Sequence, residues 1–290
     1  MLLCFAAAGG QPVRAADPVV DPKQVHTARG VIREISPDRH RAIIKHEAIV
    51  NYMPAMTMEF NVRDTNELSG VAAGDTVTFR LTATDDTHWI DHVRKLATAT
   101  NRVAVPAMHR QAATGLELKV GDLLPDGLLL DENGRRIRFT DFRGRALAFT
   151  FFFTRCPLPD FCPLMNRHFA DARGLLLADA HAPTNWQFLS ISFDPDVDRP
   201  NVLARYATNY RGSDSDWWLF AAAPTNTLAE LAPHLDLMVT RDGAGFSHNL
   251  RTVVLDTQGR IHRQFDGNQW TAEELAKAIA EASGVPRPKP

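Results

Sequence analysis

Two long apolar stretches with a helical pattern between them constrain the fold of this 290-residue chain more than any other feature. Residues 145–154 (RALAFTFFFT) and 186–193 (WQFLSISF) are almost continuously apolar, which is typical of central strands buried on both faces of a sheet. Between them, apolar residues recur at the spacing of one helix face: Met165, Phe169, Ala172 and Leu176. This order predicts a β–α–β unit with parallel strands.

The pattern that follows this unit extends the prediction to a complete fold. Helices are predicted over residues 199–210 and 226–235, and a β-hairpin turns around Gly259. Thr271 and Glu274 form a capping box that begins the last helix. A β–α–β unit followed by a hairpin and a helix predicts a thioredoxin-like α/β fold.

The N-terminal part of the chain has a different pattern. Five short segments alternate between apolar and polar residues, and they cover 30–35, 42–49, 56–62, 75–83 and 89–96. Five short strands in so few residues predict a small all-β barrel of the OB type. Its core is expected to be modest.

The flanking segments and the composition complete the predicted organisation. Residues 2–10 have the length of the apolar core of a signal peptide, and Val13, Arg14 and Ala15 fit a cleavage site, so we expect export to the periplasm. A disordered tail and a membrane tether at the N-terminus remain alternatives. We predict a leader over 1–24, a barrel over 25–98 and a linker over 99–117. An α/β domain is predicted over 118–284, followed by a tail over 285–290.

The net charge of −2 gives no reason to expect a nucleic acid as partner. No phosphate-binding glycine loop, nucleophile elbow or HExxH helix is present in the sequence, which disfavours the common nucleotide-binding and hydrolase classes.

Cys156 and Cys162 lie between the first apolar strand and its helix, in the loop TRCPLPDFCP. A position at the start of a helix favours the thiolate form of Cys162. Five residues separate the two cysteines, whereas thioredoxin-type reductases have two, so the spacing fits a redox motif poorly. Spacing alone leaves a disulfide, a nucleophile and a metal site open.

His248 is the candidate third ligand, because the segment that enters the predicted hairpin approaches the cysteine loop in a thioredoxin-like sheet. Two thiolates and one imidazole suit copper, as Cu(I) or Cu(II). The alternative is a buried histidine with a structural role. Gly243 and Gly245 suggest that the loop before His248 is mobile.

A cluster of methionines in the barrel is a second candidate site. Met53, Met56 and Met58 lie within six residues, and Met56 and Met58 share one face of a strand. His46 lies on the preceding predicted strand. A set of thioether and imidazole ligands selects Cu(I), but methionines also fill small cores, and composition alone does not decide between the two. His88 and His92 are assigned no metal-binding role.

Three motifs give the α/β part a resemblance to the Sco/SenC family of copper-handling proteins: residues 141–169, 191–207 and 247–261. The resemblance implies copper binding by Cys156, Cys162 and His248, and a role in maturing the binuclear copper site of cytochrome c oxidase. It places Asp194 near the site, although that residue could simply form a turn. The usual loop of that family has three residues between its cysteines, so the geometry of this longer loop is in question.

The stretch IKHEAIVNYMPAMTMEF resembles the CusF-type copper-binding barrel. That resemblance implies His46, Met56 and Met58 as ligands, with Met53 in place of the tryptophan that covers the metal in that family. The two resemblances together predict a periplasmic copper chaperone whose partner is the copper-acceptor subunit of cytochrome c oxidase or another periplasmic copper protein. The alternative is a thiol-disulfide oxidoreductase that uses Cys156 and Cys162. A peroxidase of the same fold is a third alternative.

Overall fold

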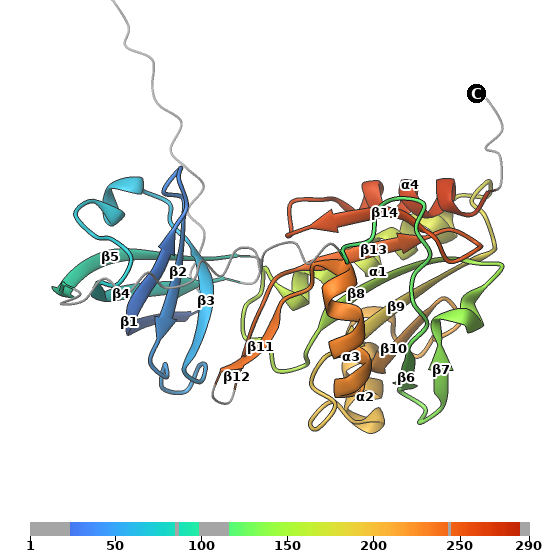
Figure 1. Cartoon of the computed structure of the whole chain (residues 1–290), viewed down its shortest axis with the longest axis horizontal. Coiled ribbons are helices and arrows are strands. Elements are labelled where there is room, and N and C mark those ends of the chain that lie inside the picture. Colours follow the sequence, from blue (N-terminus) through green and yellow to red (C-terminus); the bar gives the residue numbers. More distant parts are fainter. Residues whose placement is uncertain (1–23, 85–86, 99–115, 243–244, 285–290) are drawn as a thin grey trace, which may run out of the picture.

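The computed structural model describes residues 24–84, 87–98, 116–242 and 245–284, which form two main sheets and a separate hairpin (Figure 1). Almost all of the predicted leader, most of the predicted linker and the predicted tail lie outside the described residues. Among the residues that are described, no helix combines the length and the apolar character needed to cross a membrane.

The first sheet is antiparallel and comes entirely from the N-terminal part. Its strands are β1 (Gln24–Ile35), β2 (Arg41–His46), β3 (Met56–Asn61), β4 (Thr76–Ala83) and β5 (His88–Ala97), with a short 3₁₀ helix, η1 (Thr65–Leu68), after β3. The strand order is β3-β2-β1-β4-β5, and a parallel bridge between Val62 and Ile90 joins the two edges. The five predicted strands are therefore present in a small all-β unit, and their closure is compatible with the OB-type label.

The second sheet has seven strands in the order β14-β13-β8-β9-β10-β6-β7. The strands are β6 (Leu128–Asp131), β7 (Arg136–Arg138), β8 (Ala146–Phe152), β9 (Trp186–Ser192), β10 (Trp218–Ala222), β13 (Arg251–Leu255) and β14 (Ile261–Asp266). The helices are η2 (Phe139–Phe142), α1 (Cys162–Ala178), α2 (Pro200–Arg211), α3 (Thr225–Leu231), η3 (Ala232–Leu235) and α4 (Ala272–Ala282). Strands β8, β9 and β10 are parallel, and α1 packs against α2 and α4, as expected for a thioredoxin-like fold.

The core of this sheet explains the apolar stretches in the sequence. Every residue of β8 and β9 is buried, because helices and loops cover both faces of the central strands. The predicted apolar face of α1 is confirmed, and its four members are buried: Met165, Phe169, Ala172 and Leu176. Burial of each of the three larger side chains, Met165, Phe169 and Leu176, contributes about 1.5–3 kcal/mol to stability. The same packing fixes the loop between β8 and α1.

A two-stranded hairpin, β11 (Val239–Asp242) and β12 (Gly245–His248), extends from the α/β part toward β3 of the barrel (Figure 1). The expectation of a mobile loop before His248 is wrong for Gly245, which is a buried residue of β12. A Cβ atom at Gly245 would clash with Cε of Met56 and would lie 3.4 Å from its Sδ. Glycine therefore lets the side chain of Met56 lie directly against β12 in its present position, and Gly245 is part of a packed strand.

Candidate metal centre

Cys156, Cys162 and His248 converge at one end of the central strands. Cys156 follows β8, Cys162 is the first residue of α1, and His248 is the last residue of β12. Their donor atoms, two Sγ and one imidazole nitrogen, all lie within 4.8 Å of one another, and Cys162 Sγ is 3.7 Å from His248 Nε2. Because metal–sulfur and metal–nitrogen bonds measure about 2.0–2.3 Å, donors of one ion lie at most about 4.6 Å apart. The five-residue spacing therefore leaves both sulfurs close to the separation that one ion needs.

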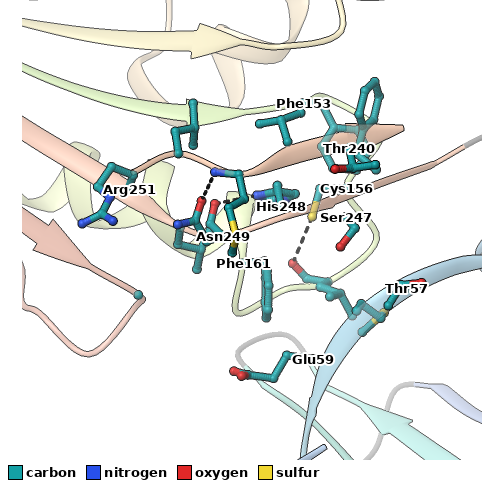
Figure 2. Close-up of a pocket in the computed structure, with 18 of the residues that line it drawn as sticks. Thr57, Glu59, Phe153, Cys156, Phe161, Thr240, Ser247, His248, Asn249 and Arg251 are labelled. Carbon is teal, nitrogen blue, oxygen red and sulfur yellow. Dashed lines mark hydrogen bonds between the residues drawn. The ribbon is translucent and has the colours of Figure 1, made fainter. Parts of the chain in front are cut away.

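The ring of His248 is held so that Nε2 is the nitrogen near the cysteines. Its Nδ1 lies 2.9 Å from the carbonyl oxygen of Asn249. A carbonyl oxygen only accepts, so Nδ1 donates its proton there, and Nε2 is the nitrogen that donates to a thiolate or, once deprotonated, binds a metal. The ring centres of Phe153 and Phe193 lie 5.8 Å and 4.9 Å from that of the imidazole ring, and Figure 2 shows Phe153 near His248. A hydrogen bond like that from Nδ1 to Asn249, on the side of the ring away from the cysteines, commonly orients a metal-binding histidine.

The pKa values of the two thiols are shifted in opposite directions. Burial opposes ionisation of Cys156, but hydrogen bonds from Cys162 and His248 outweigh it and lower the pKa of this thiol to about 5. Burial, followed by the hydrogen bond and negative charge of Cys156, raises the pKa of Cys162 well above its ordinary value. In the metal-free protein at neutral pH, one thiolate and one thiol therefore share the site, and a metal that binds both sulfurs displaces the second proton.

We expect the alkylation of Cys156 by iodoacetamide in the reduced, metal-free protein to report this thiolate directly. The lowered pKa of about 5 means that the reactive anion is present from near pH 5 upward, whereas an ordinary cysteine requires a pH of about 8.5. The rate is measured as a function of pH by mass spectrometry, and His248→Ala should move the midpoint upward. A native protein with a midpoint near the ordinary value would contradict this assignment.

Two buried aspartates form hydrogen bonds with the two residues just before Cys156. The carboxyl group of Asp198 accepts hydrogen bonds from the backbone N–H and the hydroxyl of Thr154, and from Ser192 Oγ at 2.5 Å. Asp194, predicted to lie near the site, is fully buried and accepts a hydrogen bond from Arg155 Nη2 at 2.7 Å. Neither aspartate belongs to the converging group of candidate ligands, so both act on the cysteine loop through its neighbouring residues.

The predicted ligands of the barrel share one face of two paired strands. In the antiparallel register of β2 and β3, His46 is opposite Met56, and Ile44 is opposite Met58. Residues directly opposite in such a pair have Cβ atoms about 5 Å apart. His46, Met56 and Met58 are all buried. Nδ1 of His46 lies 2.7 Å from the carbonyl oxygen of Glu47, so Nε2 is the nitrogen that would bind a metal, as in His248.

Met53 and Tyr52 are placed differently from each other. Met53 is buried in the barrel core, and its backbone pairs with Ile49. The hydroxyl of Tyr52 instead donates a hydrogen bond to the carbonyl oxygen of Pro157, between the two cysteines, at 3.1 Å. Burial, followed by the negative charges of Asp160 and Cys156, raises the pKa of Tyr52 to about 12. The hydroxyl of Tyr52 is therefore directed at the cysteine loop of the α/β part.

Sequence reasoning missed the polar partners of the loop between the cysteines. His88, assigned no role, is buried, and its Nδ1 lies 2.5 Å from Asp160 Oδ1. His92 is exposed. One sequence signal was present: Leu158 is an apolar residue between two prolines in an otherwise short loop, and it is buried in the hydrophobic cluster of the barrel. Nothing in the local sequence of His88 indicates Asp160, which is 72 residues away.

The fold and the converging side chains define a thioredoxin-like protein with a Cys₂His candidate metal centre. The chain belongs to the SCO1/SenC family, whose model matches residues 128–284. Residues 25–95 match the family model described as "Copper binding periplasmic protein CusF". Both predicted resemblances are thereby confirmed.

Individual relatives are similar to the α/β part. A curated protein of Bacillus subtilis (strain 168), described as "SCO1 protein homolog", is 26% identical over 157 residues, or 53% of this chain and 79% of that protein. A SCO1/SenC family lipoprotein from Bacillus anthracis str. Ames has a TM-score of 0.50 and 19% identity, covering 56% of this chain and 96% of its own. A BsSco structure, described as a member of the Sco family of cytochrome c oxidase assembly proteins, has a TM-score of 0.50 and 20% identity, covering 59% and 99%. The two structures support the thioredoxin-like fold.

Proposed function

We propose that this chain is a periplasmic copper chaperone that delivers copper for maturation of the binuclear copper site of cytochrome c oxidase. Membership of the SCO1/SenC family supports a copper-handling role. The single observation that carries the proposal is the convergence of Cys156 Sγ, Cys162 Sγ and His248 Nε2 within 4.8 Å. Two soft sulfur donors and one imidazole accept both Cu(I) and Cu(II).

The geometry suits a carrier rather than a permanent structural site. Three protein donors leave room for a further ligand, so a donor atom of a partner protein can enter before a protein ligand leaves. Cys156 and His248 also line a cavity of about 1100 Å³, which gives an incoming ligand access. The BsSco relative is described as belonging to a family of cytochrome c oxidase assembly proteins, which supports the oxidase as acceptor. Export to the periplasm accords with the CusF description of the barrel match.

Delivery is tested by mixing the copper-loaded chain with the metal-free copper-acceptor subunit of cytochrome c oxidase and separating the two proteins. We expect copper to leave the chaperone and appear on the acceptor in proportion to the amount added. Copper-loaded Met165→Leu protein, altered in the core of α1 rather than at either candidate site, serves as the control. Copper that stays on the chain at every ratio of acceptor would contradict the proposal.

We also propose that the barrel holds a second copper ion through His46, Met56 and Met58, with Met53 in a supporting position. The barrel match to a copper-binding family and the shared face of these side chains support this site. Met56→Leu combined with Met58→Leu is expected to reduce the Cu(I) bound per chain from two ions to one, because leucine keeps the volume and removes both thioether donors. Titration against a Cu(I) chelator measures this number, and two ions in the double variant would exclude the site.

A thiol-disulfide oxidoreductase is the second candidate, because the thiolate at Cys156 lies beside the thiol of Cys162. The thiolate would attack an acceptor disulfide, and Cys162 would then displace the acceptor, leaving a Cys156–Cys162 disulfide and a reduced acceptor dithiol. Two electrons pass to the acceptor. Insulin reduction that persists in His248→Ala protein, together with absence of bound copper, would favour this function over the chaperone.

A further inference from the structure

The two candidate copper sites open into the same cavity. Met56 and Met58 line it from the barrel, and Cys156 and His248 line it from the α/β part. Figure 2 shows Cys156 and His248 on one side and β3, carrying Thr57 and Glu59, on the other. The cavity measures about 1100 Å³. Residues of both sites therefore line one partly open cavity rather than separate surfaces of the molecule.

The strands that carry these donors are in direct contact. Strand β12 packs against β3, and Gly245 of β12 lies against the side chain of Met56 of β3. Gly245 lies three residues before His248 on the same strand. Since any side chain at Gly245 would push Met56 away, the absence of a Cβ atom brings a thioether of one site against the strand that holds the imidazole of the other.

The five residues between the cysteines, 157–161, form what we call the intercysteine segment, and this segment is fixed to the barrel. Leu158 is 3% exposed and belongs to the same hydrophobic cluster as Met53, Met56 and Met58. The carbonyl oxygen of Pro157 accepts the hydrogen bond from Tyr52. The intercysteine segment thus reaches into the hydrophobic core of the barrel through Leu158, in the cluster that holds the methionines.

Asp160 is the polar anchor of the intercysteine segment. One carboxyl oxygen lies 2.5 Å from His88 Nδ1, and the other accepts a hydrogen bond from Asn61 Nδ2 at 3.1 Å. Its backbone carbonyl accepts a hydrogen bond from Asn268 of the α/β part at 2.8 Å. Asp160 is 4% exposed, so these bonds are shielded from water. They hold the cysteine loop and the barrel in one arrangement.

We propose that copper passes directly from the barrel site to the Cys156–Cys162–His248 site within one molecule, across this shared cavity. The inference rests on the proposed function, which supplies the two sites. The step is a ligand exchange in which the ion remains Cu(I): bonds to the thioethers of Met56 and Met58 and to the imidazole of His46 break as bonds to the two cysteine sulfurs and the imidazole of His248 form. The proton of the Cys162 thiol leaves to solvent. Thiolates bind Cu(I) more tightly than neutral thioethers, which sets the direction of transfer.

The test follows the arrival of Cu(I), supplied as its water-soluble bicinchoninate complex, at the cysteines of the reduced full-length chain. Loss of the chelate colour reports total uptake, and the ultraviolet absorption of the Cu(I)–thiolate bonds reports arrival at the cysteine site. In the Met56→Leu, Met58→Leu chain we expect the thiolate signal to appear about tenfold more slowly than in the unaltered chain. In the unaltered chain, capture of the ion by the barrel raises its local concentration near the cysteines.

A complementation mixture separates transfer within one molecule from transfer between molecules. A Cys156→Ser, Cys162→Ser chain has an intact barrel, and adding it to the methionine double variant should not restore fast arrival. The inference would be overturned if the mixture restored fast arrival at equal concentration. It would also be overturned if the methionine double variant filled its cysteines as fast as the unaltered chain. If the cysteine site never fills in any chain, the proposed function fails instead.

Docking of the barrel is tested with Tyr52→Phe combined with Asp160→Ala. This variant keeps all predicted ligands, and we expect it to bind the same final number of copper ions while its cysteines fill about tenfold more slowly. Asp91→Ala, which removes a surface ion pair with Arg80 on the same barrel, is the matched control and should fill at the unaltered rate. Unaltered filling in the docking variant would show that the fixed interface is not needed, and the inference would be wrong.

Discussion

A chain with both Cys156 and Cys162 replaced by serine is expected to bind one Cu(I) ion fewer and to deliver none to the oxidase subunit. Serine hydroxyls are hard, neutral donors, so the remaining imidazole of His248 is the only strong ligand of that site. We expect the affinity of the site to fall by more than about a thousandfold, equivalent to about 4 kcal/mol. Competition against a Cu(I) chelator of known affinity measures the change.

The barrel supplies an internal control for this experiment. It should keep its single ion in the serine variant, which shows that the protein is folded and that the chelator is working. His248→Ala should give an intermediate loss, because both sulfurs remain. A serine variant that retains two copper ions and still delivers copper would remove the Cys156–Cys162–His248 centre from the mechanism.

Asp198→Ala is expected to destabilise the α/β part by about 3 kcal/mol, because hydrogen bonds to a charged acceptor contribute about 1.5–3 kcal/mol each and their donors stay buried. The variant leaves the backbone N–H and hydroxyl of Thr154 and the hydroxyl of Ser192 without the carboxyl group. Since Thr154 is two residues before Cys156, we also expect the affinity for copper to fall.

Urea unfolding of the reduced, metal-free chain measures this loss of stability. Four of the five tryptophans, Trp186, Trp217, Trp218 and Trp270, lie in the α/β part, so fluorescence follows mainly that unit. The two units need not unfold together, and the transition is therefore compared only with the same signal in the unaltered chain. Asp91→Ala at the barrel surface is the control, with an expected change below about 1 kcal/mol. Equal midpoints for Asp198→Ala and the unaltered chain would contradict the structural role of Asp198.

Periodicity accounts for the success of the fold prediction. Continuous apolar runs predicted β8 and β9, the helical spacing from Met165 to Leu176 predicted the buried face of α1, and alternation predicted the five barrel strands. These patterns are local, because a strand or helix selects its apolar face from residues a few positions apart. The topology they imply also placed His248 near the cysteines, which the geometry bears out at 3.7 Å from Cys162.

The contacts between the two units were not predictable in this way. Tyr52 and Pro157 are 105 residues apart, and Asn61 and Asp160 are 99 apart. A polar residue can satisfy its hydrogen bonds in many ways, so its identity does not specify a distant partner. Gly245 was misread for the same reason: glycine is suited both to mobile loops and to close packing, and only the position of Met56 distinguishes these roles.

The sequence alone determined the two folded units, the chemical character of their donor sets and the family resemblance, because these depend on residue type and short-range spacing. Tertiary structure alone decided that five residues between the cysteines still bring both sulfurs to one point. It also decided that those residues anchor the barrel and that members of both donor sets line one cavity. These features depend on how the surface of the barrel packs against that of the α/β part. A local sequence pattern does not specify which distant surface a residue will contact.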